Sequence, residues 1–149
     1  MTSPLTSARI DPRALNTILE AYGAATDSEP CGLLLGHVTQ GIVRISEAVT
    51  TDNDHPGPES AFRIPGAALA SIQRDARGSG LEIVGQWHGH LRGGPDPGRA
   101  DREGLESSEV VDERPRAMLI VGRGVGTSPV LRGYVRRNDE VKEIPVGRT

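Results

Sequence analysis

The sequence has little cysteine, few aromatic residues and no long hydrophobic run. Cys31 is the only cysteine among 149 residues, so no disulfide can form within the chain, as is usual in a reducing cytoplasm. The apolar stretches, such as 118–121, are far shorter than the roughly 18 residues that a membrane-spanning helix needs. Residues 1–4 have neither a basic nor an apolar region typical of a signal peptide. We therefore expect a cytoplasmic protein with no membrane segment.

Positive charge is also too sparse for a nucleic-acid-binding protein. The net charge is -3, and Lys142 is the only lysine. Because phosphate binding requires a concentrated basic surface, we expect no nucleic-acid partner. A hydrophobic fraction of 36% and a charged fraction of 25% exclude a fibrous repeat and a disordered chain. At about 100–200 residues per domain, residues 1–149 are predicted to form a single domain.

Hydrophobic periodicity predicts an α/β fold with mostly antiparallel strand pairs. Asp11 and Pro12 are typical of a helix start, and this helix should end near Gly23. A second helix is predicted from 65 to about 76, and a short third one over 99–108. The predicted strands cover 31–38, 42–49, 61–64, 81–90, 117–122, 130–136 and 141–146. The continuous run 33–35 indicates a strand that is buried on both faces.

Two of the four histidines lie in one tripeptide, His88-Gly89-His90, at the end of a predicted strand. Alternate residues of a strand point the same way, so both imidazoles can face one point. Asp101 follows after a Gly/Pro loop that is long enough to fold back beside them. Two histidines and one carboxylate leave a fourth zinc position open, which is typical of catalytic zinc sites. The same residues are equally consistent with two exposed histidines and an aspartate that caps a helix.

A second motif favours the metal site over the helix cap. Glu29 precedes the segment Cys-Gly-Leu-Leu-Leu-Gly at 31–36, and a glutamate at the mouth of a buried strand is a candidate general base. Together these residues resemble the JAMM (MPN-plus, or JAB) zinc metallopeptidase family, in particular its small bacterial single-domain members. That family has a Glu before such a strand, then H-x-H, seven residues, Ser, two residues and Asp. The chain keeps this spacing with His88, His90, Gly98 and Asp101.

The resemblance implies both a fold and an activity. The fold would be an MPN-like (cytidine-deaminase-like) α-β-α arrangement with a mixed, mostly antiparallel sheet flanked by helices. One zinc ion per chain would be held by His88, His90 and Asp101, and Glu29 would accept a proton from water. Members of the family cleave peptide or isopeptide bonds after the Gly-Gly tail of ubiquitin-like proteins. The small bacterial members are most similar to enzymes that trim ubiquitin-like sulfur-carrier proteins.

Two positions depart from the family pattern. Gly98 replaces the family's Ser, whose hydroxyl helps to hold the oxyanion, so only the Gly98 N–H could serve there. Leu91 replaces the Pro that usually follows the second histidine. The alternative function is therefore a catalytically weak or idle MPN-like module that binds a ubiquitin-like tail or a partner protein.

Other metal folds fit less well. A cupin would need a Glu soon after the second histidine, and zinc deaminases need His-x-Glu and a Cys pair. Structural roles are predicted for His37 and Cys31, a solvated loop position for His55, and a core position for Trp87, whose side chain should point away from both motif histidines.

Overall fold

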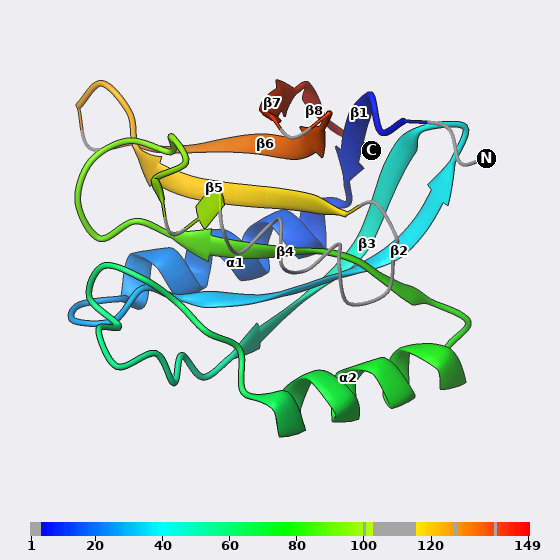
Figure 1. Cartoon of the computed structure of the whole chain (residues 1–149), viewed down its shortest axis with the longest axis horizontal. Coiled ribbons are helices and arrows are strands. Elements are labelled where there is room, and N and C mark those ends of the chain that lie inside the picture. Colours follow the sequence, from blue (N-terminus) through cyan, green and yellow to red (C-terminus); the bar gives the residue numbers. More distant parts are fainter. Residues whose placement is uncertain (1–3, 100, 103–115, 127, 139) are drawn as a thin grey trace.

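The computed structural model describes residues 4–99, 101–102, 116–126, 128–138 and 140–149. These residues form one eight-stranded sheet with the strand order β7-β6-β5-β4-β2-β3-β1-β8, together with the helices α1 and α2 (Figure 1). The bounds are β1 Ser7–Ile10, α1 Pro12–Ala24, β2 Cys31–Thr39, β3 Ile42–Thr51, α2 Gly66–Gly78, β4 Glu82–Gly89, β5 Ala117–Arg123, β6 Pro129–Arg137, β7 Glu140–Ile144 and β8 Val146–Arg148.

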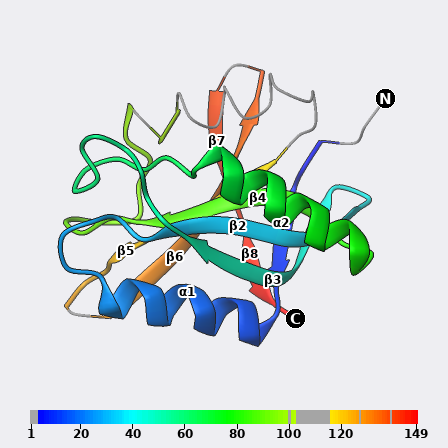
Figure 2. The ribbon, with the colours of Figure 1, turned by 90° about the horizontal axis from the view of Figure 1, so that it is seen from below.

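The two helices cover opposite faces of the sheet, so that strands β2 and β3 lie between them (Figure 2). Strand β2 is buried on both sides, as predicted. Leu34 belongs to the larger core that includes α1, whereas Leu33 and Leu35 belong to a smaller core with Ala76 of α2. This alternation follows from the two-residue period of a strand. The architecture is therefore a three-layer α/β/α arrangement.

Local sequence signals explain most element boundaries. The Asp11 side chain accepts a hydrogen bond from the Arg13 N–H and so caps the start of α1. Gln40 and Gly41 both have positive φ, at 52° and 80°, as the two-residue turn between β2 and β3 requires. The predicted helices over 11–23 and 65–76 are confirmed with small shifts of their ends. Of the predicted helix over 99–108, the described residues 99, 101 and 102 are helical, and 103–108 lie outside the described residues.

Two strand predictions are wrong. Residues 61–64 form no strand, because the Asn53 side chain takes backbone hydrogen bonds that a neighbouring strand would make. The predicted strand over 141–146 is two strands that meet at Pro145, which has no N–H to continue a ladder. Its second part, β8, pairs in parallel with β1, which was not predicted at all. Short strands with few apolar residues carry a weak alternation signal.

The sheet is mixed, with four antiparallel and three parallel strand pairs among the described residues. The prediction of an α/β fold with mostly antiparallel pairs is therefore confirmed. The cytidine-deaminase-like arrangement stays a prediction. Among the described residues, no helix has the length and apolar character needed to cross a membrane.

Candidate metal centre

The register of the sheet places Glu29 and the start of β2 beside the tripeptide His88-Gly89-His90 at the end of β4. Cys31 of β2 lies opposite His88 of β4, and the Gly89 N–H donates to the Pro30 carbonyl oxygen at 2.9 Å. Glu29 is the next residue back along the chain, so it lies near the point where β4 ends. Gly89 must be a glycine here, since a Cβ atom would lie 2.6 Å from the Tyr22 ring. The tripeptide His88-Gly89-His90 therefore fits tightly against the start of β2.

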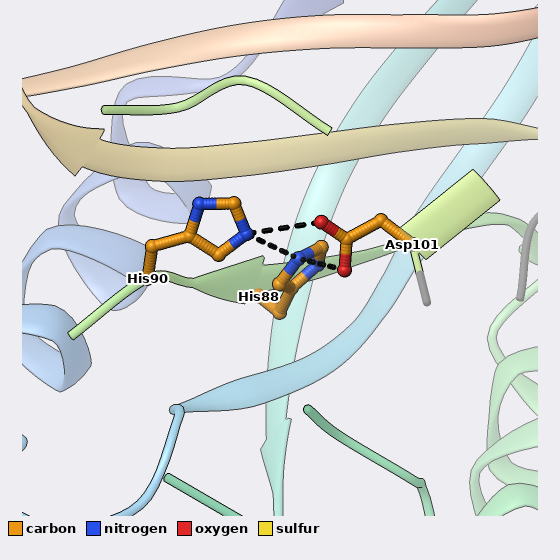
Figure 3. Close-up of side chains that lie close together, drawn as sticks. All are labelled: His88, His90 and Asp101. Carbon is orange, nitrogen blue, oxygen red and sulfur yellow. Dashed lines mark hydrogen bonds and ion pairs between the residues drawn. The ribbon is translucent and has the colours of Figure 1, made fainter. Parts of the chain in front are cut away.

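His88, His90 and Asp101 converge on one point, as the sequence predicts (Figure 3). The Nε2 atoms of the two histidines are 3.3 Å apart. Asp101 Oδ1 lies 2.9 Å from His88 Nε2, and Asp101 Oδ2 lies 3.0 Å from His90 Nε2. His88 is fully buried and Asp101 is nearly so. One oxygen and two nitrogens thus lie within 4.8 Å of one another, which is a suitable set of ligands for zinc.

The tautomer of His90 is fixed by the loop that follows it. Its Nδ1 lies 2.9 Å from the Gly94 carbonyl oxygen, and a carbonyl oxygen only accepts, so Nδ1 carries a proton. In the neutral ring, this leaves Nε2 as the atom with a free electron pair for a metal. Metal-bound histidines usually make such a second hydrogen bond. The donor geometry of His90 therefore fits a metal ligand.

Burial and hydrogen bonding shift the pKa values of all three groups. The hydrogen bond to Asp101 raises the pKa of His90 to about 9. Burial lowers the pKa of His88. Burial also raises the pKa of Asp101, but hydrogen bonds from both histidines outweigh it and hold that pKa well below its usual range. These shifts favour an ionised Asp101 carboxylate between the two imidazoles.

The Gly/Pro loop over 92–98 positions Asp101 through several hydrogen bonds. The Arg123 N–H donates to the Gly93 carbonyl oxygen at 2.9 Å. The Tyr134 hydroxyl donates to the Pro95 carbonyl oxygen at 2.8 Å. At the end of the loop, the Gly98 N–H donates to Asp101 Oδ2 at 2.9 Å. The loop predicted to fold back does so, and the Gly98 N–H contacts a carboxylate rather than pointing freely into the cleft.

Glu29 is the candidate general base, and its side chain is buried close to the triad. Only 4% of its surface is exposed, and Oε1 has no hydrogen-bond partner among the described residues. Burial raises its pKa to about 7, while the charge of His90 lowers the pKa and that of Asp101 raises it. A carboxylate with a pKa near neutrality is well matched to accept and return a proton. Glu29 therefore has the environment expected of a general base.

Asn53 and Phe62 also belong to the site, although no pattern in the sequence indicates a role for them. The Asn53 side chain makes five hydrogen bonds to backbone groups, one of them to the Glu29 carbonyl oxygen at 3.1 Å. The Phe62 ring stacks on the His88 ring. Phe62 is the only phenylalanine of the chain, which is the one sequence signal that could have drawn attention to it.

An open cleft gives access to the triad. It has a volume of about 720 Å³ and is lined by Glu29, His90, Gly98 and Asp101, among others. Its outer walls carry charged side chains, namely Asp27, Glu59, Arg92 and Arg99. The donor set, the fixed His90 tautomer and the unpartnered Glu29 oxygen together fit a catalytic zinc ion with room for a substrate.

The remaining sequence candidates lie apart from this chemistry. Cys31 is buried in β2 beside Thr51, and burial raises the pKa of its thiol, which makes it unreactive. Trp87 is fully buried in the core on the α1 side, as predicted. His37 is exposed and lines a separate pocket with Arg77. His55 accepts a hydrogen bond from the Gly57 N–H and so shapes its own loop.

The comparison with known families agrees with this site. Residues 12–133 match the family described as prokaryotic homologs of the JAB domain. The chain therefore belongs to that family of metallopeptidase-related domains.

Solved structures show the same fold. A solution structure of a protein from Desulfitobacterium hafniense matches with a TM-score of 0.80 at 18% identity, over 95% of this chain and 92% of that one. A solution structure of a protein from Salinibacter ruber matches with a TM-score of 0.66 at 22% identity, over 95% and 91%. No curated protein matches the chain.

Proposed function

We propose that this protein is a zinc-dependent peptidase or isopeptidase. The observation that carries the proposal is the convergence of His88, His90 and Asp101 in a cleft that also contains the buried, unpartnered carboxyl group of Glu29. A structural zinc site would need a fourth protein ligand, and a general base beside it would have no use. Membership of the JAB family supports the same activity.

Each residue has a distinct part in the proposed reaction. His88, His90 and Asp101 would hold one zinc ion per chain. Zinc in such a site acts as a Lewis acid, which lowers the pKa of water to about 7 and polarises a carbonyl oxygen. Glu29 would take a proton from the attacking water as its oxygen bonds to the scissile carbonyl carbon. Glu29 would then pass that proton to the amine nitrogen as the C–N bond breaks.

The proposed substrate is the C-terminal tail of a ubiquitin-like or sulfur-carrier protein in the cytoplasm, cut after Gly-Gly. The resemblance to small bacterial JAMM peptidases supports this choice. The cleft agrees with an extended peptide, because His90 and Asp101 line it together with charged side chains of both signs. A nucleic acid or a membrane surface would not suit a chain of net charge -3.

The direct test combines a metal assay with a cleavage assay. Purified protein is loaded with zinc, and its metal content is measured by elemental analysis. It is then incubated with ubiquitin-like proteins that carry extra residues after Gly-Gly, and mass spectrometry detects release of the extension. We expect about one zinc per chain and cleavage at the Gly-Gly carbonyl. Absence of zinc binding after reconstitution would overturn the proposal.

A module that binds the tail without efficient cleavage is the second candidate. It is favoured by Gly98, which offers no side-chain donor and whose N–H donates to Asp101 Oδ2. Removal of one oxyanion donor costs roughly a hundred- to a thousand-fold in rate. Tight binding of a Gly-Gly tail by the zinc-loaded protein, without cleavage, would favour this candidate over the enzyme.

A further inference from the structure

His88 differs from His90 in what surrounds its second ring nitrogen. His90 Nδ1 is held by the Gly94 carbonyl oxygen, as described above. His88 Nδ1 is buried and has no hydrogen-bond partner among the described residues. Metal-binding histidines are usually oriented by a hydrogen bond at this second nitrogen. Some other contact must therefore fix the ring of His88.

The Phe62 ring makes that contact. The two ring centroids are 4.3 Å apart, and the planes differ by 20°, so the rings are stacked face to face. Phe62 also packs against a small buried core formed by Met118, Ile120 and Tyr134. Rotation of the His88 ring out of its plane would break the stack with Phe62. Stacking thus restrains the direction in which His88 Nε2 points.

Asn53 in turn fixes Phe62 through both of its chain neighbours. Asn53 Nδ2 donates to the Ala61 carbonyl oxygen at 2.9 Å, and the Arg63 N–H donates to Asn53 Oδ1 at 3.1 Å. Phe62 lies between these two anchored residues. One amide side chain therefore holds the backbone on both sides of the stacked ring.

We propose that Phe62, anchored by Asn53, is a positioning residue that fixes the ring of His88 for metal binding. The inference rests on the metal-binding part of the proposed function and adds to it the orientation of one ligand. A flat ring at position 62 is the required feature, since a flexible side chain would fill the volume without restraining the imidazole. The His90 ring needs no such partner because Gly94 holds it.

Zinc affinity of Phe62 variants tests the proposal without any substrate. Affinity is measured by competition with a chromophoric chelator, and the visible absorption of the Co²⁺-loaded protein reports the ligand geometry. We expect Phe62→Leu to weaken zinc binding by about 10- to 100-fold, the usual effect of losing a residue that orients a metal ligand. Phe62→Tyr keeps a flat ring and should retain affinity within about three-fold, well below that usual effect.

Val141→Ala is the matched control. Val141 packs on the same buried core as Phe62, so its truncation should lower thermal stability without changing zinc affinity or the Co²⁺ spectrum. Unchanged affinity in folded Phe62→Leu, or an equal loss in Val141→Ala, would overturn the proposal. If Phe62→Leu does not fold, Phe62→Met, which keeps more of the volume, replaces it with the same expectation.

Asn53→Asp tests the second step. The substitution keeps the shape but replaces the Nδ2 donor by an oxygen that faces the Ala61 carbonyl. We expect weaker zinc binding than in the wild type, and unchanged affinity in the folded variant would overturn the role of Asn53. Wild-type protein that binds no zinc would overturn this inference together with the metal site. Zinc binding without peptide cleavage would overturn only the peptidase function.

Discussion

Two loops meet at the end of β4, and they hold the site in different ways. The loop over 92–98 is held by three separate hydrogen bonds, from the Arg123 N–H, the Tyr134 hydroxyl and its own Gly98 N–H. The loop over 52–64 is organised largely around one side chain, that of Asn53. The first loop delivers a ligand, Asp101. The second supports the base and the stacked ring.

This difference in hydrogen bonding predicts how each loop responds to a substitution. Loss of one hydrogen bond in the 92–98 loop leaves the others in place, so removing a single one should have a small effect on the position of Asp101. In the 52–64 loop, the hydrogen bonds converge on the side-chain amide of Asn53. The same amide donates to the Glu29 carbonyl oxygen. The variants below remove a ligand, remove the base, add an oxyanion donor and remove one hydrogen bond of the 92–98 loop.

Removal of Asp101 should have the largest effect. Asp101→Ala deletes the only carboxylate of the triad and leaves a buried and a partly exposed histidine as ligands, so we expect stoichiometric zinc binding to be lost. Elemental analysis after zinc reconstitution and gel filtration measures this. Asp96→Ala is the control, because Asp96 is an exposed carboxylate of the 92–98 loop that precedes Asp101. One zinc per chain in Asp101→Ala would exclude Asp101 as a ligand.

Glu29→Gln should abolish turnover but retain zinc. The amide has nearly the shape of the carboxyl group but cannot accept a proton, and general-base catalysis contributes about 10²- to 10⁴-fold. Initial rates on a Gly-Gly-extended substrate are compared at equal zinc content. Glu47→Gln, which changes an exposed glutamate of β3 outside the cleft, should leave the rate unchanged. Loss of zinc from Glu29→Gln would show instead that Glu29 is a ligand.

Gly98→Ser should raise kcat. Gly98 does not have a positive φ, and among the described residues a Cβ atom there would meet only Asp101 Oδ2, at an ordinary distance of 3.7 Å. The added hydroxyl could reach the developing oxyanion, and a hydrogen bond to a charged group contributes about 1.5–3 kcal/mol, or roughly ten- to a hundred-fold in rate.

Gly98→Ala separates the hydroxyl from the added carbon. It should retain zinc and leave kcat near that of the wild type, because its methyl group donates no hydrogen bond. A gain in Gly98→Ala equal to that in Gly98→Ser would assign the effect to loop stiffness rather than to the hydroxyl. Lower activity in Gly98→Ser with zinc retained would mean that another group already stabilises the oxyanion.

The ligand triad could be predicted from the sequence, whereas its support could not. The two-residue period of a strand lets His88 and His90 face one point, and the Gly/Pro loop lets Asp101 fold back to them. That pattern alone fits a helix cap equally well, and the resemblance to the JAMM family favours the metal site. The buried run 33–35 likewise predicts a strand covered on both faces. Each of these features involves residues that lie close together in the sequence. The stack of Phe62 on His88 joins a loop to a strand 26 positions away, and no local pattern encodes it.

The same reasoning explains the errors in the fold. The segment 61–64 has the composition of a strand, but its backbone groups are taken by Asn53, a side chain eight residues before it. Strand β8 pairs with β1 from the other end of the chain. Hydrogen bonds between distant segments depend on the completed fold, so they lie beyond what periodicity can indicate.

Tyr134→Phe should have the smallest effect, since it removes one of several ties of the 92–98 loop. The buried Tyr134 hydroxyl donates to the Pro95 carbonyl oxygen at 2.8 Å, and its loss leaves that oxygen without this donor. We expect destabilisation by about 1 kcal/mol, a fall in Tm of roughly 2–4 °C for a protein of this size. Zinc affinity should stay within about three-fold, because the remaining ties still position Asp101.

Tyr22→Phe gives the matched comparison, because the Tyr22 hydroxyl is buried with no hydrogen-bond partner among the described residues. Removing an unpartnered polar atom relieves its desolvation cost, so Tyr22→Phe should leave Tm unchanged or raise it. Thermal unfolding of both metal-free variants, followed by circular dichroism, measures the difference. Equal Tm values would mean that the Tyr134 bond contributes nothing. A large loss of zinc affinity in Tyr134→Phe would show that the 92–98 loop depends on one tie, as the 52–64 loop does on Asn53.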